Sequence, residues 1–199
     1  MSGASPVTLE RKGHIGVITV DYPPVNALGP GVADGIKDCV TRGNLDPAIK
    51  AMVLIGAGRS FIAGADIRGF GTNRARPPLG QRVYDTLDAS EKPVVAAIHG
   101  YALGGGLEIA MACHYRVALP SARVGLPEVL IGILPGGGGT QRLPRLTGVR
   151  PALDMIITGR HLPASEAKQL GIIDAVLPQG SDLHDGAVDF AIGLATSRP

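Results

Sequence analysis

Two glutamates, Glu108 and Glu128, lie in sequence surroundings that would suit acid–base catalysis. Glu108 follows a run of glycines, in the first turn of an expected helix, where an acid commonly compensates the helix dipole. Glu128 lies between Gly125-Leu126-Pro127 and an apolar stretch, where a carboxyl group is costly to bury unless it is paired or neutralised. Taken singly, dipole compensation and a solvated loop carboxylate are the simpler explanations. Taken together, the two acids suit a pair in which burial raises at least one pKa, so that one donates a proton and the other accepts.

The sequence before Glu108 predicts a strand at Val94–Ile98, a glycine loop at Gly100–Gly106 and then a helix. The successive glycines let the backbone approach a ligand closely, and the first helical turn presents unpaired N–H groups. Such a place binds a phosphate, or it stabilises an oxyanion that develops during a reaction. A dinucleotide site is disfavoured, because neither GxxxxGK[ST] nor GxGxxG is present and no ribose-binding acid ends the next strand.

A third segment, Gly58–Ile67, follows an expected strand that ends near Ile55. Its small residues Ala63 and Ala65 leave room for a ligand against the backbone, and Asp66 is placed to cap the following turn. On its own, such a stretch is more often a tight turn than a site.

The alternation of apolar runs and helical patterns predicts an α/β fold in one domain, since 199 residues suit one ordinary core. Strands are expected at four runs: Ile15–Val20, Ala51–Ile55, Val94–Ile98 and Tyr115–Leu119. Helices are expected at six segments: Gly31–Thr41, Leu79–Ala89, Gly105–Cys113, Pro151–Thr158, Ser165–Gly171 and Leu183–Ala195. The elements recur at intervals of roughly 40 residues, which suggests stacked ββα units without a visible sequence repeat.

Composition and charge exclude several classes of function. The net charge of +2 comes without a basic stripe and interleaved aromatics, so a nucleic-acid partner is disfavoured. The local basic cluster, which suits a solvated loop or a small phosphorylated ligand, is Arg68, Arg74, Arg76 and Arg82. Two cysteines and five scattered histidines give no metal site, and neither a signal pattern nor a membrane-spanning run is present. We therefore expect a soluble intracellular protein with no metal and no membrane partner.

The three segments together resemble the crotonase superfamily, specifically its enoyl-CoA hydratases. The matching stretches extend over nearly the whole chain: PVNAL (24–28), FIAGADI (61–67), KPVVAAIHGYALGGGLE (92–108), GLPE (125–128), GILPG (132–136), GGGTQRLPR (137–145), GRHLPA (159–164) and EAKQLG (166–171). HYRVA (114–118) with VGLPE (124–128) is especially similar to the hydratase/isomerase domain that opens the peroxisomal-type multifunctional enzymes of β-oxidation. The resemblance implies a crotonase-like spiral of repeated ββα units.

The resemblance also implies a role for each candidate residue. The amides of Ala65 and Gly105 would form an oxyanion hole for the thioester carbonyl. Glu108 would orient and deprotonate water for attack at C3 of a 2-enoyl-CoA, and Glu128 would deliver a proton to C2. Coenzyme A, as part of the substrate, would bind at Pro24, Val25, Ala63, Asp66 and Ile67. This syn addition of water, a step of fatty-acid β-oxidation, would need no metal or redox cofactor.

The presence of both glutamates favours hydration over pure isomerisation. Family isomerases of the mitochondrial kind keep an acid like Glu128 and replace the one like Glu108. A 3-enoyl to 2-enoyl isomerase is a second expected activity, because one acid suffices to move a proton between C2 and C4. Two alternatives stay open: another crotonase reaction such as thioester hydrolysis, and a non-catalytic acyl-CoA binding or scaffolding module.

Stand-alone hydratases continue into further helices that cover the acyl pocket and assemble trimers, whereas this sequence ends at Pro199. We therefore expect a single crotonase-like core domain over residues 1–199 that lacks the C-terminal helical region. Its expected partners are an acyl-CoA substrate and either a fused 3-hydroxyacyl-CoA dehydrogenase module or further copies in a homo-oligomer. The bacterial cytoplasm and the peroxisome both stay open as compartments.

Overall fold

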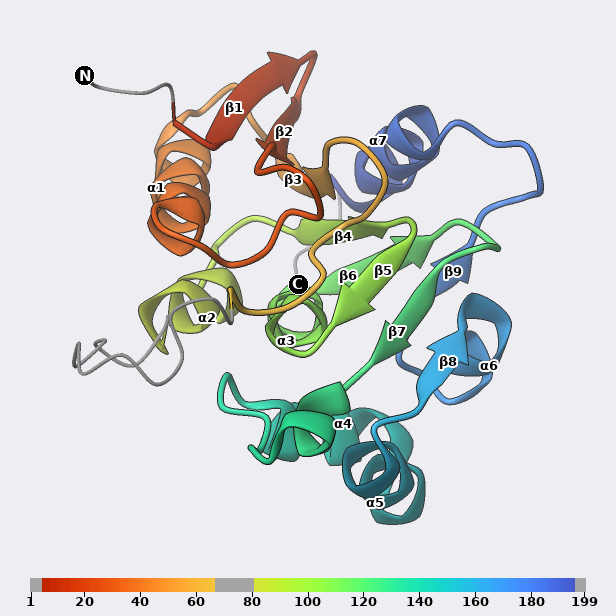
Figure 1. Ribbon diagram of the computed structural model, residues 1–199. Helices are drawn as coiled ribbons and strands as arrows, with labels where there is room; N and C mark the ends of the chain where they lie inside the picture. The colour runs from red at the N-terminus through yellow and green to blue at the C-terminus, as the bar shows by residue number, and fades with distance from the viewer. Residues whose placement is uncertain (1–4, 67–80, 196–199) are drawn as a thin grey trace.

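The computed structural model describes residues 5–66 and 81–195, and its centre is a six-stranded sheet in the order β1-β2-β3-β4-β6-β9 (Figure 1). Its strands are β1 (Val7–Lys12), β2 (Ile15–Val20), β3 (Ala51–Gly56), β4 (Val94–Ile98), β6 (Tyr115–Ala118) and β9 (Ala175–Val176). β1 and β2 pair antiparallel, and the remaining neighbours in this sheet run parallel. The apolar runs of β3 and β4 are buried throughout, as expected for parallel strands covered on both faces.

Helices α1 (Val32–Leu45), α2 (Gln81–Asp88) and α3 (Gly105–Ala112) lie on one side of this sheet, and α7 (Leu183–Leu194) covers the other. Helices α4 (Gly139–Thr147) and α5 (Val149–Thr158) pack on each other, on α3 and on the 3-10 helix η2 (Pro127–Ile131), and α6 (Ala164–Gln169) packs against the strands near the end of the chain. Val53 and Val95 face α7, where they pack with Ala187. The alternate positions of the same strands, such as Leu54 and Ala96, belong to the larger core with α1, α2 and α3. Among the described helices, none combines the length and the apolar character needed to cross a lipid bilayer.

A second layer of short strands forms from the chain that leaves the main sheet. β5 (Tyr101–Leu103), β7 (Arg123–Gly125) and β8 (His161–Pro163) make a three-stranded sheet in the order β5-β7-β8. A bridge between Ile62 and Ala102 places the segment after β3 beside β5. Thus β4–β5–α3 and β6–β7–η2 follow the same path of main strand, second-layer strand and helix. The expected α/β class and the spiral of ββα units are confirmed.

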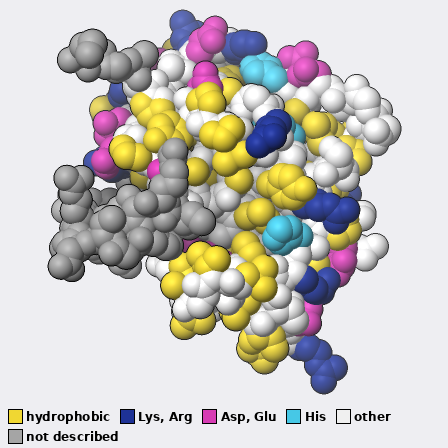
Figure 2. Space-filling model, viewed as in Figure 1, with side chains coloured by type: hydrophobic (Ala, Val, Ile, Leu, Met, Phe, Trp, Pro, Cys, Tyr) yellow, Lys and Arg dark blue, Asp and Glu magenta, His cyan; other side chains and the backbone are white. Residues whose placement is uncertain are grey.

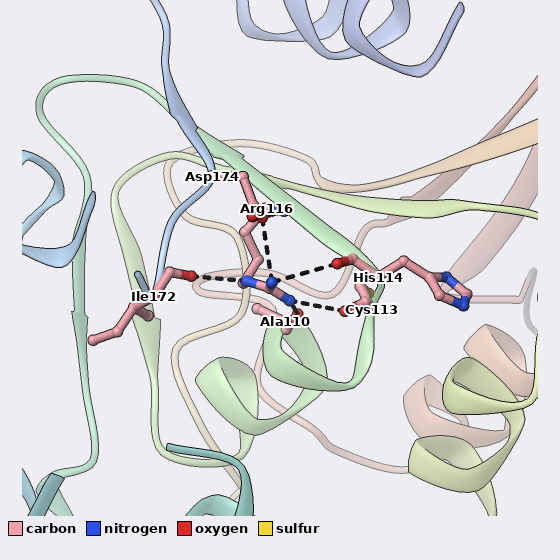
Figure 3. A network of polar contacts seen from close by, with 6 residues as sticks. All are labelled: Ala110, Cys113, His114, Arg116, Ile172 and Asp174. Atoms are coloured by element: carbon pink, nitrogen blue, oxygen red, sulfur yellow. Dashed lines mark hydrogen bonds and ion pairs between the residues drawn. The ribbon is translucent and has the colours of Figure 1, made fainter. Parts of the chain in front are cut away.

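Arg116 joins three parts of this core (Figure 3). Its buried guanidinium donates to the carbonyl oxygens of Ile172 at 2.8 Å, Cys113 at 2.8 Å and Ala110 at 3.2 Å, and it pairs with Asp174 at 3.2 Å. Ala110 and Cys113 belong to the C-terminal end of α3, where carbonyls lack intrahelical donors. Arg116 therefore caps the helix that carries the glycine loop at its other end.

The longer predicted elements are confirmed with small shifts at their ends. The strands Ile15–Val20 and Val94–Ile98 have the expected bounds, whereas α5 begins at Val149 rather than Pro151. The expected helix Leu79–Ala89 corresponds to α2, although residues 79–80 lie outside the described part of the chain. Arg68, Arg74 and Arg76 of the basic cluster also lie outside it, and the side chain of Arg82 is not described.

Candidate active site

The glycine loop after β5 brings two backbone amides together. Gly104 has a φ of 50° and precedes α3, so the Gly105 amide lies in the first helical turn and has no intrahelical acceptor. A side chain at Gly106 would overlap the carbonyl oxygen of Ile62, so only glycine lets the segment after β3 pack this closely. As a result, the Ala65 amide nitrogen lies 3.9 Å from the point where a Gly105 Cβ would stand. The two amides that were expected to act together are neighbours.

The Glu108 side chain is buried on α3 and is held by backbone donors from the start of α4 and the loop before it. Its Oε1 accepts hydrogen bonds from the Gly137 and Gly139 amides, both at 2.8 Å. Burial raises the pKa of Glu108, while the Gly139 and Gly137 amides and the positive charge of Arg142 oppose that rise. The Oε1 atom is therefore fixed, and its ionised form has dedicated support.

The Glu128 side chain is buried on η2 and has less support for its charge. Burial raises the pKa of Glu128 to about 7; its own backbone amide opposes the rise, and the nearby Glu108 charge adds to it. Within the described residues, its Oε2 atom has no hydrogen-bond partner. A Cβ at Gly104 would lie 2.9 Å from its Oε1, so the carboxyl group rests against the glycine loop. From the sequence, Glu128 could be either a loop carboxylate that points to water or a buried acid of a pair. Because its side chain is buried, the structure supports the buried acid.

One cavity of about 650 Å³ is lined by both glutamates and by Ala65 and Gly105. Tyr84 of α2 and Arg142 of α4 also contribute to its wall. Four residues that lie far apart in the sequence, and that were predicted to form one site, therefore meet in one place. A site with two acids of raised pKa beside free backbone amides is suited to general acid–base chemistry on a carbonyl compound.

A second cavity of about 610 Å³ meets the first at Ala65, Gly105 and Glu128. Four of the five residues expected to bind coenzyme A line this second cavity: Pro24, Val25, Ala63 and Asp66. The fifth, Ile67, lies outside the described residues. The two cavities therefore extend to either side of the amide pair, as a thioester with an acyl chain on one side and a long thiol on the other requires.

Exposed leucines stand at the outer walls of both cavities, in the first beside the exposed polar residues Gln141 and Arg145. Leu130 lines the second cavity and Leu134 the first, and they are 69% and 71% exposed. Figure 2 shows hydrophobic side chains gathered at the lower edge of the view, over α5 and the loop before α4.

Several residues that build the site were not predicted from the sequence. Asn26 is buried with a φ of 55°, and its Nδ2 donates to the carbonyls of Ala57 at 2.8 Å and Ser60 at 2.9 Å, which ties the two segments beside the second cavity. The Gly137 and Gly139 amides, described above, lie in a glycine cluster whose role was not assigned. The only signals were this glycine density and the asparagine inside PVNAL (24–28).

One group of three metal-ligand types lies together among the described residues: Asp182, His184 and Asp185. Asp182 is the N-cap of α7 and accepts from the Asp185 amide at 2.9 Å. Helix capping accounts for this cluster, and none of its members lines either cavity. We assign it no metal.

The fold and the site together define the class of the protein. The chain belongs to the enoyl-CoA hydratase/isomerase family, whose sequence pattern matches residues 10–199.

Individual members of the family show which kinds of enzyme the chain is similar to. The peroxisomal bifunctional enzyme of Danio rerio is 49% identical over 188 residues, which are 94% of this chain and 26% of that protein. The peroxisomal fatty acid beta-oxidation multifunctional protein AIM1 of Arabidopsis thaliana is 44% identical over 96% of this chain and 28% of its own. The crystal structure of enoyl-CoA hydratase from Bacillus anthracis superposes with a TM-score of 0.89 at 34% identity, over 96% of this chain and 76% of that one. The chain thus spans about a quarter of the length of the curated relatives.

Proposed function

We propose that this domain is an enoyl-CoA hydratase, which adds water to the double bond of a 2-enoyl-CoA thioester. The observation that carries the proposal is the meeting of Glu108, Glu128 and the amides of Ala65 and Gly105 in one cavity. Hydration of such a double bond places negative charge on the thioester oxygen, and fixed donors in a buried site stabilise that charge. The family and the names of the relatives support the same reaction.

The two glutamates take different parts in this reaction. Glu108, whose ionised form is supported by two amides and by Arg142, accepts a proton from water as the water oxygen bonds to C3. Glu128, with a pKa of about 7, is substantially protonated at neutral pH and gives its proton to C2. Electrons of the double bond pass through the thioester oxygen, and each amide there lowers the barrier by about 3 kcal/mol. Proton exchange with solvent then restores both acids.

The second cavity is the proposed site for the coenzyme A part of the substrate. Pro24, Val25, Ala63 and Asp66 line it, and Ile67 follows directly in the chain. Because the two cavities join at Ala65 and Gly105, a substrate that spans both would present its thioester carbonyl to the two amides. No metal or redox cofactor is proposed, since every step is a proton transfer or the addition of water.

A second activity, the shift of a 3-enoyl double bond to position 2, is proposed for Glu128. This reaction needs one group that carries a proton between C4 and C2. The Oε2 atom of Glu128 has no partner among the described residues, and a pKa of about 7 suits both accepting and releasing a proton near neutral pH. Thioester hydrolysis by the same amide pair is the alternative reaction.

We also propose that the domain works beside a 3-hydroxyacyl-CoA dehydrogenase module, which would oxidise the 3-hydroxyacyl product. The support is that its curated relatives, four times longer than the matched region, are named bifunctional or multifunctional. Assembly of the domain as a homo-oligomer is the alternative. The names of these relatives favour the peroxisome as the compartment over the bacterial cytoplasm.

The test of the hydratase proposal is the pair of variants Glu108→Gln and Glu128→Gln, assayed with 2-butenoyl-CoA by loss of the conjugated-thioester absorbance. Each should lower kcat by roughly 10²- to 10⁴-fold while the circular dichroism spectrum stays that of the parent. Glu10→Gln on β1, an exposed position, is the matched control.

Near-normal turnover in either site variant would remove that glutamate from its role. Acyl-CoA binding without turnover in the parent would favour a non-catalytic module. With a 3-enoyl-CoA, only Glu128→Gln should stop isomerisation.

A further inference from the structure

Tyr84 places a third side-chain polar group in the cavity of the two glutamates. It belongs to α2, and the residue is 6% exposed with its ring in the main core. A Cβ at Gly105 would lie 3.7 Å from its hydroxyl oxygen. A Cβ at Gly137 would overlap the same hydroxyl and would lie 2.6 Å from Glu108 Oε2. The hydroxyl therefore lies close to both the Gly105 backbone and Glu108 Oε2, the carboxylate oxygen that the Gly137 and Gly139 amides do not hold.

This hydroxyl has no partner within the protein as described. Over residues 5–66 and 83–195, no backbone or side-chain group forms a hydrogen bond with it. Tyr84 lines the cavity, and its hydroxyl is not among the fully buried polar atoms that lack a partner, so the oxygen opens onto the cavity. A phenylalanine ring would fill the same core space without offering a hydrogen bond there. Water or a ligand in the cavity is therefore the partner that the geometry offers this hydroxyl.

The protonation state of the group is set by its surroundings. Burial, and after it the negative charges of Glu108 and Glu128, raise the pKa of the Tyr84 hydroxyl. The group keeps its proton at neutral pH, so it can donate one hydrogen bond and accept others.

We propose that Tyr84 is a third hydrogen-bonding group for the water that attacks C3, and for the 3-hydroxyl group that this water becomes. The Oε1 atom of Glu108 is occupied by two amides, so Oε2 is the oxygen left to receive the proton of the water. Tyr84 flanks that oxygen, and a water between them is held at two points. In the reverse direction the same hydroxyl donates to the departing oxygen. The tyrosine keeps its proton throughout. The inference rests on the proposed hydratase function.

A binding comparison isolates this contact from turnover. Butanoyl-CoA and 3-hydroxybutanoyl-CoA differ by the 3-hydroxyl group, and their affinities are measured by calorimetry in a Glu128→Gln background, with and without Tyr84→Phe. The added change should weaken 3-hydroxybutanoyl-CoA by about three- to tenfold and leave butanoyl-CoA unchanged. In the parent background, Tyr84→Phe should lower kcat for hydration by roughly tenfold with little change in KM, because the hydroxyl meets water and not coenzyme A.

The matched control is Tyr115→Phe, because Tyr115 packs against Phe190 on the opposite face of the sheet. It should change neither affinity nor kcat. Equal loss of both ligands in Tyr84→Phe, or no loss of either, would overturn the inference and leave Tyr84 as a packing residue. Failure of the parent protein to hydrate 2-butenoyl-CoA, with the selective loss of 3-hydroxybutanoyl-CoA still present, would instead refute the hydratase proposal and keep the contact.

Discussion

The carboxylate of Glu108 on α3 is hydrogen-bonded to the first amide of another helix: its Oε1 accepts from the Gly139 N–H at 2.8 Å, where α4 begins. The N-terminus of a helix presents unpaired N–H groups and favours negative charge. The Gly137 amide reaches the same oxygen at 2.8 Å. These two hydrogen bonds fix Oε1 of Glu108, the proposed base. The direction in which Oε2 points therefore depends on where α4 starts.

Gly139→Ala should disturb that direction. The new Cβ would lie 2.9 Å from Glu108 Oε1 and 3.0 Å from both Leu126 Cδ1 and Pro135 Cβ, so the carboxylate or α4 must shift. We expect kcat for 2-butenoyl-CoA hydration to fall by roughly 10- to 100-fold, since small misplacements of catalytic groups are costly. Gly193→Ala, at an exposed position of α7 where a Cβ meets nothing within 4 Å, is the control and should keep full activity. A fully active Gly139→Ala protein would contradict the positioning role.

Glu128 should make the protein less stable as pH rises toward 7. Its folded-state pKa of about 7 exceeds the ordinary value, so the folded protein binds more protons than the unfolded chain between those two values. Stability is therefore lost across that window, by about 2–3 kcal/mol between about pH 5 and pH 8. Glu128→Gln cannot ionise and should lose less stability over the same range.

Urea unfolding of the parent and of Glu128→Gln at both pH values measures this difference. Glu10→Gln is again the surface control, and it should follow the parent. Parallel pH dependences for the parent and Glu128→Gln would mean that the Glu128 carboxyl is not desolvated in the folded protein.

The parts of the site that were predictable from sequence are those with local signals. Glu108 and Gly105 follow a strand and belong to one glycine loop, and Glu128 stands in an apolar stretch, so burial could be argued from neighbours alone. Ala65 lies in a stretch of small residues that suits a turn. The buried runs of β3 and β4 likewise predicted strands that the structure confirms.

What was missed depends on contacts between distant segments. The sequence of α2 gives no sign that the Tyr84 hydroxyl reaches the cavity, because that depends on how α2 packs on α3. The Gly139 amide reaches Glu108 only because α4 begins at that residue, in a helix that also contains Pro144 and was not predicted. β5, β7 and β8 have three residues each, too few to show the alternation of a strand.

Arg116→Lys should destabilise the fold without touching the cavity. Lysine keeps the positive charge, but it lacks the planar donors that reach Ile172, Ala110 and Cys113 from one side chain. The Ala110 carbonyl keeps the Cys113 amide as a donor, whereas the carbonyls of Ile172 and Cys113 lose the Arg116 donors. This loss should cost about 3 kcal/mol in the free energy of unfolding, measured in urea at neutral pH.

A surface ion pair is the matched comparison. Arg160 pairs with Asp154 and Glu166, and its side chain is 40% exposed, so Arg160→Lys should cost less than about 1 kcal/mol. Equal losses in the two variants would show that burial of the Arg116 network contributes nothing beyond a surface pair.

Arg142→Gln should move the pH dependence of hydration. Arg142 on α4 is paired with Asp88 on α2, and its positive charge holds the pKa of Glu108 lower than burial alone would set it. Without that charge, Glu108 stays protonated to a higher pH and cannot accept a proton from water there. The acid limb of kcat/KM should therefore shift to higher pH, while Arg160→Gln, whose partners lie outside the cavity, should leave it in place. An acid limb that does not move in Arg142→Gln would limit Arg142 to joining α2 and α4, and would leave the two amides as the principal support of the Glu108 charge.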